Sequence, residues 1–111
     1  MSDRRKQPRF KALGLSTPFG EVTDISDAGL GVFRKGKIDL SLGDTVTLAI
    51  SHENAELEIT ARVARIDKVG LFRHEVGFVF VDVDEDTLTR IWTLADSACS
   101  EFAGPRCWVA A

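Results

Sequence analysis

The chain has 111 residues, of which 44% are hydrophobic and 28% are charged, and its formal net charge is −3. This length fits one domain with a real hydrophobic core that needs neither a disulfide nor a structural metal. No apolar run is long enough to span a bilayer, and no apolar stretch typical of a secretory signal follows the basic N-terminus. The two cysteines, Cys99 and Cys107, lack the spacing of a metal site, which favours a cytoplasmic location.

The charge is distributed unevenly along the chain. Residues 1–11 hold five basic side chains and one acidic one, a local charge of +4, whereas residues 12–111 hold nine basic and sixteen acidic ones, or −7. Proteins that lie along DNA or RNA usually have a basic face on the folded body. The pattern therefore argues against a nucleic-acid partner and favours capture of a small anion by the N-terminal segment. A solvated charged terminus is the alternative.

Short strand-like runs separated by turn signals occupy the first three quarters of the chain. Apolar and polar alternation, together with turn punctuation, predicts strands over residues 10–16, 19–25, 29–34, 45–51, 57–67 and 72–81. Within 57–67 the alternation slips after Val63, and Ile66 is the next large apolar residue. This slip predicts a β-bulge near Ala64.

The hydrophobic period changes from two to about three and a half after residue 83. The apolar positions of an amphipathic helix are Leu88, Ile91, Trp92, Ala95, Ala98 and Phe102. Asp84 and Asp86 are candidate N-cap residues, and Gly104-Pro105 predicts the end of the helix. We expect Trp92 and Cys99 to be packing residues.

Six short strands followed by one amphipathic helix predict a mainly β protein, a six-stranded antiparallel β-barrel with a C-terminal α-helix over one open end or side. The domain is expected over residues 10–103, followed by a tail over 104–111. We expect residues 1–9 to form a flexible basic segment that binds ligand, because it is polar and has no apolar anchor before Phe10.

Two short polar patterns suggest a ligand site. Residues 5–9 form an Arg-x-x-x-Arg pattern preceded by Arg4, and residues 24–29 form an Asp-x-Ser-x-x-Gly pattern at a strand end. Each pattern alone is weak, but the two in this order are more specific. At these residues, and over roughly residues 4–103, the chain resembles the PilZ family. Only fourteen residues separate Arg9 from Asp24, fewer than expected for that family.

The resemblance implies a receptor for cyclic di-GMP (c-di-GMP), a bacterial second messenger, with no enzymatic activity, no cofactor and a downstream protein partner. The ligand-binding residues that it implies are Arg4, Arg5, Arg9, Asp24, Ser26 and Gly29. Arginine suits this ligand because its planar fork matches both phosphate and the O6/N7 edge of guanine. We expect Asp24 and Ser26 to share the outer face of the strand. Gly29 is expected to allow a sharp turn, a positive φ or close approach of the ligand.

Several alternatives remain open from the sequence. The Asp-Ser-Gly pattern is also a common turn composition, and a PilZ-like adaptor that binds only protein is the second functional candidate. We expect His52 to be exposed and His74 to be an ordinary rim or core residue. Arg62 and Arg65 near the bulge are expected on the surface, with an edge of the pocket as the alternative. No nucleophile–base pair, phosphate-binding glycine loop or metal spacing supports an enzyme.

Overall fold

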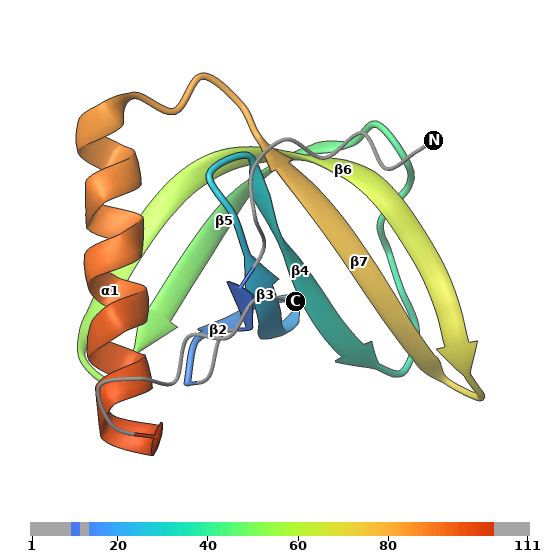
Figure 1. Ribbon diagram of the computed structural model, residues 1–111. Coiled ribbons are helices and arrows are strands. Elements are labelled where there is room, and N and C mark those ends of the chain that lie inside the picture. The colour runs from blue at the N-terminus through green and yellow to red at the C-terminus, as the bar shows by residue number, and fades with distance from the viewer. Residues whose placement is uncertain (1–9, 12–13, 104–111) are drawn as a thin grey trace.

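The computed structural model describes residues 10–11 and 14–103, and it describes side-chain surroundings for residues 14–97. Seven strands and one helix follow one another along the chain (Figure 1). They are β1 (Phe10–Lys11), β2 (Ser16–Thr17), β3 (Gly20–Ile25), β4 (Gly29–Lys35), β5 (Thr45–His52), β6 (Ala55–Gly70), β7 (Arg73–Phe80) and α1 (Glu85–Ala103).

Six of these strands close into an antiparallel barrel. The pairing order β3-β2-β5-β6-β7-β4 returns to its start, because β4 also pairs with β3. The short β1 is added beside β3, where Phe10 pairs with Ile25. The predicted barrel is therefore confirmed. The expected first strand over 10–16 is represented by β1 and β2, two short pieces that pair with opposite ends of β3.

Alternation along the strands separates the core from the outer surface. The side chains of Val22, Val32 and Val76 are adjacent on β3, β4 and β7, and all three are buried inside the barrel. The pairing of β6 with β7 shifts between Val63 and Arg65, which confirms the predicted bulge. After this shift Ile66 occupies the inward-facing position, and Arg65 therefore faces outward.

Helix α1 covers the side of the barrel formed by β5 and β6 (Figure 1). Its apolar stripe buries Ile91, Leu94 and Ala95 in the same core as the strands. Asp84 is the N-cap, because its carboxylate accepts a hydrogen bond of 2.8 Å from the backbone N–H of Thr87. That hydrogen bond lowers the pKa of the Asp84 carboxyl below its ordinary value. Among the described residues, no helix is both long and apolar enough to cross a membrane.

Candidate functional site

A row of four paired residues crosses the outer face of the barrel. Asp24 on β3 pairs with Gly31 on β4, Gly31 pairs with Gly77 on β7, and Gly77 pairs with Arg65 on β6. Directly paired residues project from the same face of a sheet. The next row along these strands, which contains Val32 and Val76, is buried in the core. The Asp24–Arg65 row therefore faces outward.

Asp24, Gly31 and Arg65 of this row line a trough with a cavity volume of about 210 Å³, and Gly77 lies between Gly31 and Arg65 in the row. The lining residues are Thr23, Asp24, Gly31, Val32, Arg65, Glu75 and Val76. A Cβ atom at Gly31 would lie 2.6 Å from Asp24 Oδ1, and a Cβ atom at Gly77 would lie 3.3 Å from Arg65 Nε. The Asp24 carboxylate therefore lies over Gly31 and the Arg65 side chain lies over Gly77, and both glycines are buried. With these two side chains moved aside, the glycines would present a strip of backbone that suits a planar heterocycle with hydrogen-bonding groups at both ends.

Arg65 lies at the β6 end of the trough. Its Nη1 donates to the Asp67 carboxylate over 2.8 Å, and the two side chains are 54% and 45% exposed. Exposed pairs of this kind contribute little net free energy, so a ligand anion could take the place of Asp67 at little cost. Arg65 is on the surface, as expected, and its side chain also lines the trough. Arg62 is exposed and lies outside the trough.

Ser26 stabilises the turn after β3 and does not face solvent. Its side chain is buried, and its hydroxyl accepts a hydrogen bond of 3.2 Å from Ala28 N–H. Its backbone N–H donates to the Gly29 carbonyl over 2.8 Å. The expectation that Ser26 shares the outer face with Asp24 is therefore wrong. The strand ends at Ile25, so alternation no longer determines where the next side chain points.

Gly29 begins β4 at a point where two strands approach closely. A Cβ atom at this position would collide with the backbone carbonyl oxygen of Phe78 on β7. Among the described glycines, those with a positive φ are Gly14, Gly20, Gly36 and Gly43, and Gly29 is not one of them. The reason for glycine here is the approach of β7, and the expected positive φ is not observed.

The turn that carries this motif is bonded to helix α1. The indole Nε1–H of Trp92 donates to Asp27 Oδ1 over 2.8 Å. Trp92 also packs against the core cluster, as the sequence predicts. The hydrogen bond to Asp27 is an additional contact, and helical periodicity could not reveal it. It connects the Asp-Ser-Gly motif directly to the helix.

The three predicted arginines, Arg4, Arg5 and Arg9, lie outside the described residues, as does the rest of the segment 1–9 and the tail 104–111. The described chain begins at β1, where Lys11 pairs with Asp24. The strand β1, which follows the arginine motif in the sequence, therefore lies beside Asp24 at one end of the trough.

The two histidines lie outside the trough. His52 is buried, not exposed as expected, and its Nδ1 lies 3.2 Å from the Gly14 carbonyl oxygen. The segment before β2 covers this side chain, and strand alternation does not predict such a cover. His74 is half-buried on β7, in agreement with the expected rim position.

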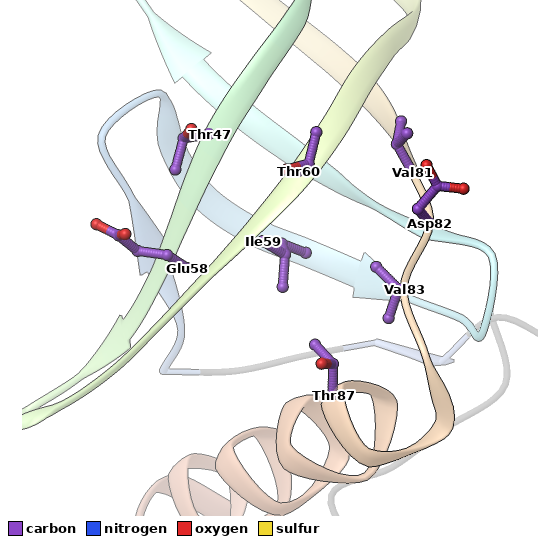
Figure 2. A pocket seen from close by; sticks show the side chains of 8 residues that line it. All are labelled: Thr47, Glu58, Ile59, Thr60, Val81, Asp82, Val83 and Thr87. Atoms are coloured by element: carbon purple, nitrogen blue, oxygen red, sulfur yellow. The ribbon is translucent and has the colours of Figure 1, made fainter.

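A second pocket, with a volume of about 380 Å³, lies between the β5–β6 pair and the start of α1 (Figure 2). Its lining residues are Thr47, Glu58, Ile59, Thr60, Val81, Asp82, Val83 and Thr87. Figure 2 shows the carboxylates of Glu58 and Asp82 on opposite sides of this pocket. Both of its charged residues are acidic, so an anionic ligand is disfavoured here. The trough also holds the carboxylates of Asp24 and Glu75, but it contains a cation, Arg65, so it is the better candidate for an anion.

Comparison with known proteins places this geometry in a family. No curated protein matches the chain. Among solved structures, the chain is similar to YcgR from Escherichia coli in a crystal structure described as a complex with c-di-GMP, with a TM-score of 0.67 and 16% sequence identity. The match covers 89% of this chain and 49% of that one, so this chain spans about half the length of YcgR.

The family model described as "PilZ domain" matches residues 3–97. This range includes both sequence motifs and every strand of the barrel. The chain therefore belongs to the PilZ domain family.

Proposed function

We propose that this protein is a receptor for c-di-GMP and not an enzyme. The observation that carries the proposal is the position of Asp24, whose motif stands at one end of the outward-facing glycine trough, beside the strand that follows the arginine motif. Membership of the PilZ family supports it, and YcgR, which shares the fold, is described as a complex with this ligand.

The residues of the trough have complementary roles in this proposal. The side chains of Asp24 and Arg65, which lie over Gly31 and Gly77, move aside, and a guanine base takes their place on the backbone of the two glycines. Asp24 accepts hydrogen bonds from the N1–H and the exocyclic amine of that base. Arg65 leaves Asp67 and donates to a phosphate or to the O6/N7 edge of the guanine. Ser26 and Gly29 act indirectly, because they shape the turn that holds Asp24.

The arginine motif supplies the remaining positive charge. Arg9 directly precedes Phe10, and Phe10 pairs with Ile25, the neighbour of Asp24. Arg9 is four positions after Arg5 in the sequence, a chain length of at most about 14 Å. In the proposed complex Arg5 and Arg9 therefore close over the ligand, with Arg4 as a helper, and each forms charge-assisted bidentate hydrogen bonds.

Isothermal titration with c-di-GMP, with GTP as the competing nucleotide, tests this function. We expect binding by the wild type, and a Kd at least about tenfold weaker for Arg5→Ala or Arg9→Ala because each loses a charge-assisted contact. Arg90→Ala on the exposed face of α1 is the matched control, since Arg90 pairs with Asp86 of the same helix at 3.3 Å. Wild-type affinity in both motif variants would remove the proposed site. Absence of c-di-GMP binding by the wild type would leave the protein adaptor as the function.

We further infer that ligand binding is transmitted to helix α1 and from there to a downstream protein in the cytoplasm. Asp27 lies within the motif turn, and Trp92 on α1 donates to its carboxylate. A ligand that holds Asp24 biases the position of this turn, and the hydrogen bond couples that position to the helix.

The variant Trp92→Phe tests this coupling, because it removes the N–H donor and keeps an aromatic ring. We expect the Kd for c-di-GMP to change by less than about threefold, since Trp92 is outside the trough. We also expect the ligand-dependent change in amide hydrogen exchange of α1 to be lost, while Arg90→Ala retains it. If α1 in Trp92→Phe responds to c-di-GMP as the wild type does, this hydrogen bond is not the connection.

A further inference from the structure

The hairpin between β6 and β7 ends in exposed apolar side chains. Leu71 is 75% exposed, Phe72 is 65% exposed and Val69 is 48% exposed, and we call these three residues the hairpin tip. In Figure 1 the tip projects beyond the barrel on the side opposite α1. Three of the four exposed large hydrophobic residues of the described chain therefore gather at one protruding point. Such clusters commonly mark an interaction site.

The backbone of Phe72 is also strained. Its φ is 59°, a left-handed conformation that favours glycine or asparagine in a short hairpin loop and is unusual for a bulky residue. The conformation is held in place by Gly36 N–H, which donates to the Phe72 carbonyl over 2.7 Å. Phenylalanine at this position is thus unfavourable for backbone geometry and for solvation. A role outside the folding of the domain explains why the tip carries it.

Positive charge surrounds the tip on a body that is otherwise acidic. Residues 14–97 contain eight Lys or Arg and fifteen Asp or Glu, a net charge of −7. Of those eight cations, Lys35, Lys68 and Arg73 are exposed beside the tip. Arg73 on β7 pairs with Lys35 on β4. Lys68 on β6 pairs with His74 on β7 in the adjacent row, and the side chains of that row project from the other face of the sheet. Cations therefore stand on both sides of the apolar tip.

We propose that the hairpin tip docks on an anionic lipid surface. A membrane interface accepts a convex apolar point, because Leu71 and Phe72 can enter the boundary between headgroups and acyl chains while the cations remain at the headgroups. Basic side chains near an anionic leaflet add attraction that salt weakens. The remaining body, with its net negative charge, is repelled by the same surface, so the hairpin sets the orientation. This site is separate from the c-di-GMP trough and does not depend on it.

Flotation with vesicles tests this proposal on the full chain. The probes are vesicles of phosphatidylglycerol and phosphatidylcholine in equal parts, and vesicles of phosphatidylcholine alone. We expect binding to the anionic vesicles that weakens at high salt, and partition at least about tenfold weaker for the double variant Leu71→Ser/Phe72→Asn. Asparagine tolerates the positive φ, so the melting temperature of this variant should not fall below that of the wild type.

Leu42→Ser is the matched control, because Leu42 is 66% exposed and its neighbour Gly43 is bonded to Val63 in the middle of β6, not to the tip. It should keep partition within about twofold of the wild type. The basic segment 1–11 is unchanged in every variant. If attraction by that segment alone caused the binding, the tip variant would still bind the anionic vesicles, and this result would overturn the proposal. Failure of the wild type to bind anionic vesicles would also overturn it. Sedimentation velocity could also overturn the proposal. A dimer in the wild type and a monomer in the tip variant, without lipid binding, would mean that the tip contacts a second protein.

Discussion

Gly29→Val is expected to lower the free energy of unfolding by roughly 3–5 kcal/mol, the range of severe single substitutions. A Cβ atom at this position collides with the carbonyl oxygen of Phe78, so β4 must move away from β7. The pairs Gly29–Val79 and Leu30–Phe78 hold these strands together, and Leu30 and Phe78 are buried in the core. Moving the backbone therefore disturbs hydrogen bonds and packing together. Equilibrium denaturation in urea measures the loss.

Gly36→Ala is the control that distinguishes the cost of a Cβ clash with a neighbouring strand from the cost of an unfavourable φ. Gly36 has a φ of 91°, but nothing lies within 4 Å of a Cβ atom there. Its replacement should therefore show only the conformational cost, about 1–2 kcal/mol. If Gly29→Val is no more destabilising than Gly36→Ala, then the approach of β7 does not determine the residue at position 29. The same samples can be titrated with c-di-GMP to test whether ligand also lies near Gly29.

Local periodicity was sufficient to predict most elements of this fold, although it did not show that the expected strand over 10–16 divides into β1 and β2. The alternation that predicted a strand over 45–51 matches β5, in which Leu48 and Ile50 are buried, and the slip after Val63 located the bulge of β6. The change to helical spacing predicted α1, and the acidic residues at its start made Asp84 and Asp86 the candidate N-caps, of which the structure shows Asp84. Each of these features depends on neighbours within a few residues along the chain, which the sequence displays directly.

The trough could be predicted only in part, because it depends on pairing between distant strands. The motif pointed to Asp24, but Gly31 and Gly77 join it only through the register of β3, β4 and β7. The clue available in the sequence was a glycine inside each of two strands, which often marks a close approach of backbone or ligand. Similarly, Ser26 was expected outside and is buried, because the chain turns after Ile25. Non-local contacts, not local propensities, determine these positions.

Gly77→Leu is expected to weaken c-di-GMP binding at least about thirtyfold, roughly 2 kcal/mol, while the domain remains folded. The new side chain would stand on the outer face between Gly31 and Arg65 and would occupy the strip on which the base is proposed to lie. The nearest atoms to a Cβ at position 77 belong to the Arg65 side chain, which is 54% exposed and free to move aside. Leucine is also more favourable than glycine within a strand, so the melting temperature should change little.

Thr60→Leu provides the comparison that makes this result specific to the trough. Thr60 is exposed on β6 and lines the second, acidic pocket, so leucine there fills a different hollow on the same strand (Figure 2). We expect Thr60→Leu to bind c-di-GMP within about twofold of the wild type, because no charge or contact of the trough is altered. The reverse pattern, with binding lost in Thr60→Leu and kept in Gly77→Leu, would move the ligand to the second pocket. Asp24 and Arg65 would then have no direct part in recognition, and the arginine motif would have to act from elsewhere. Titration of both variants against the same ligand stock distinguishes the two pockets, since each substitution fills one pocket and leaves the other open.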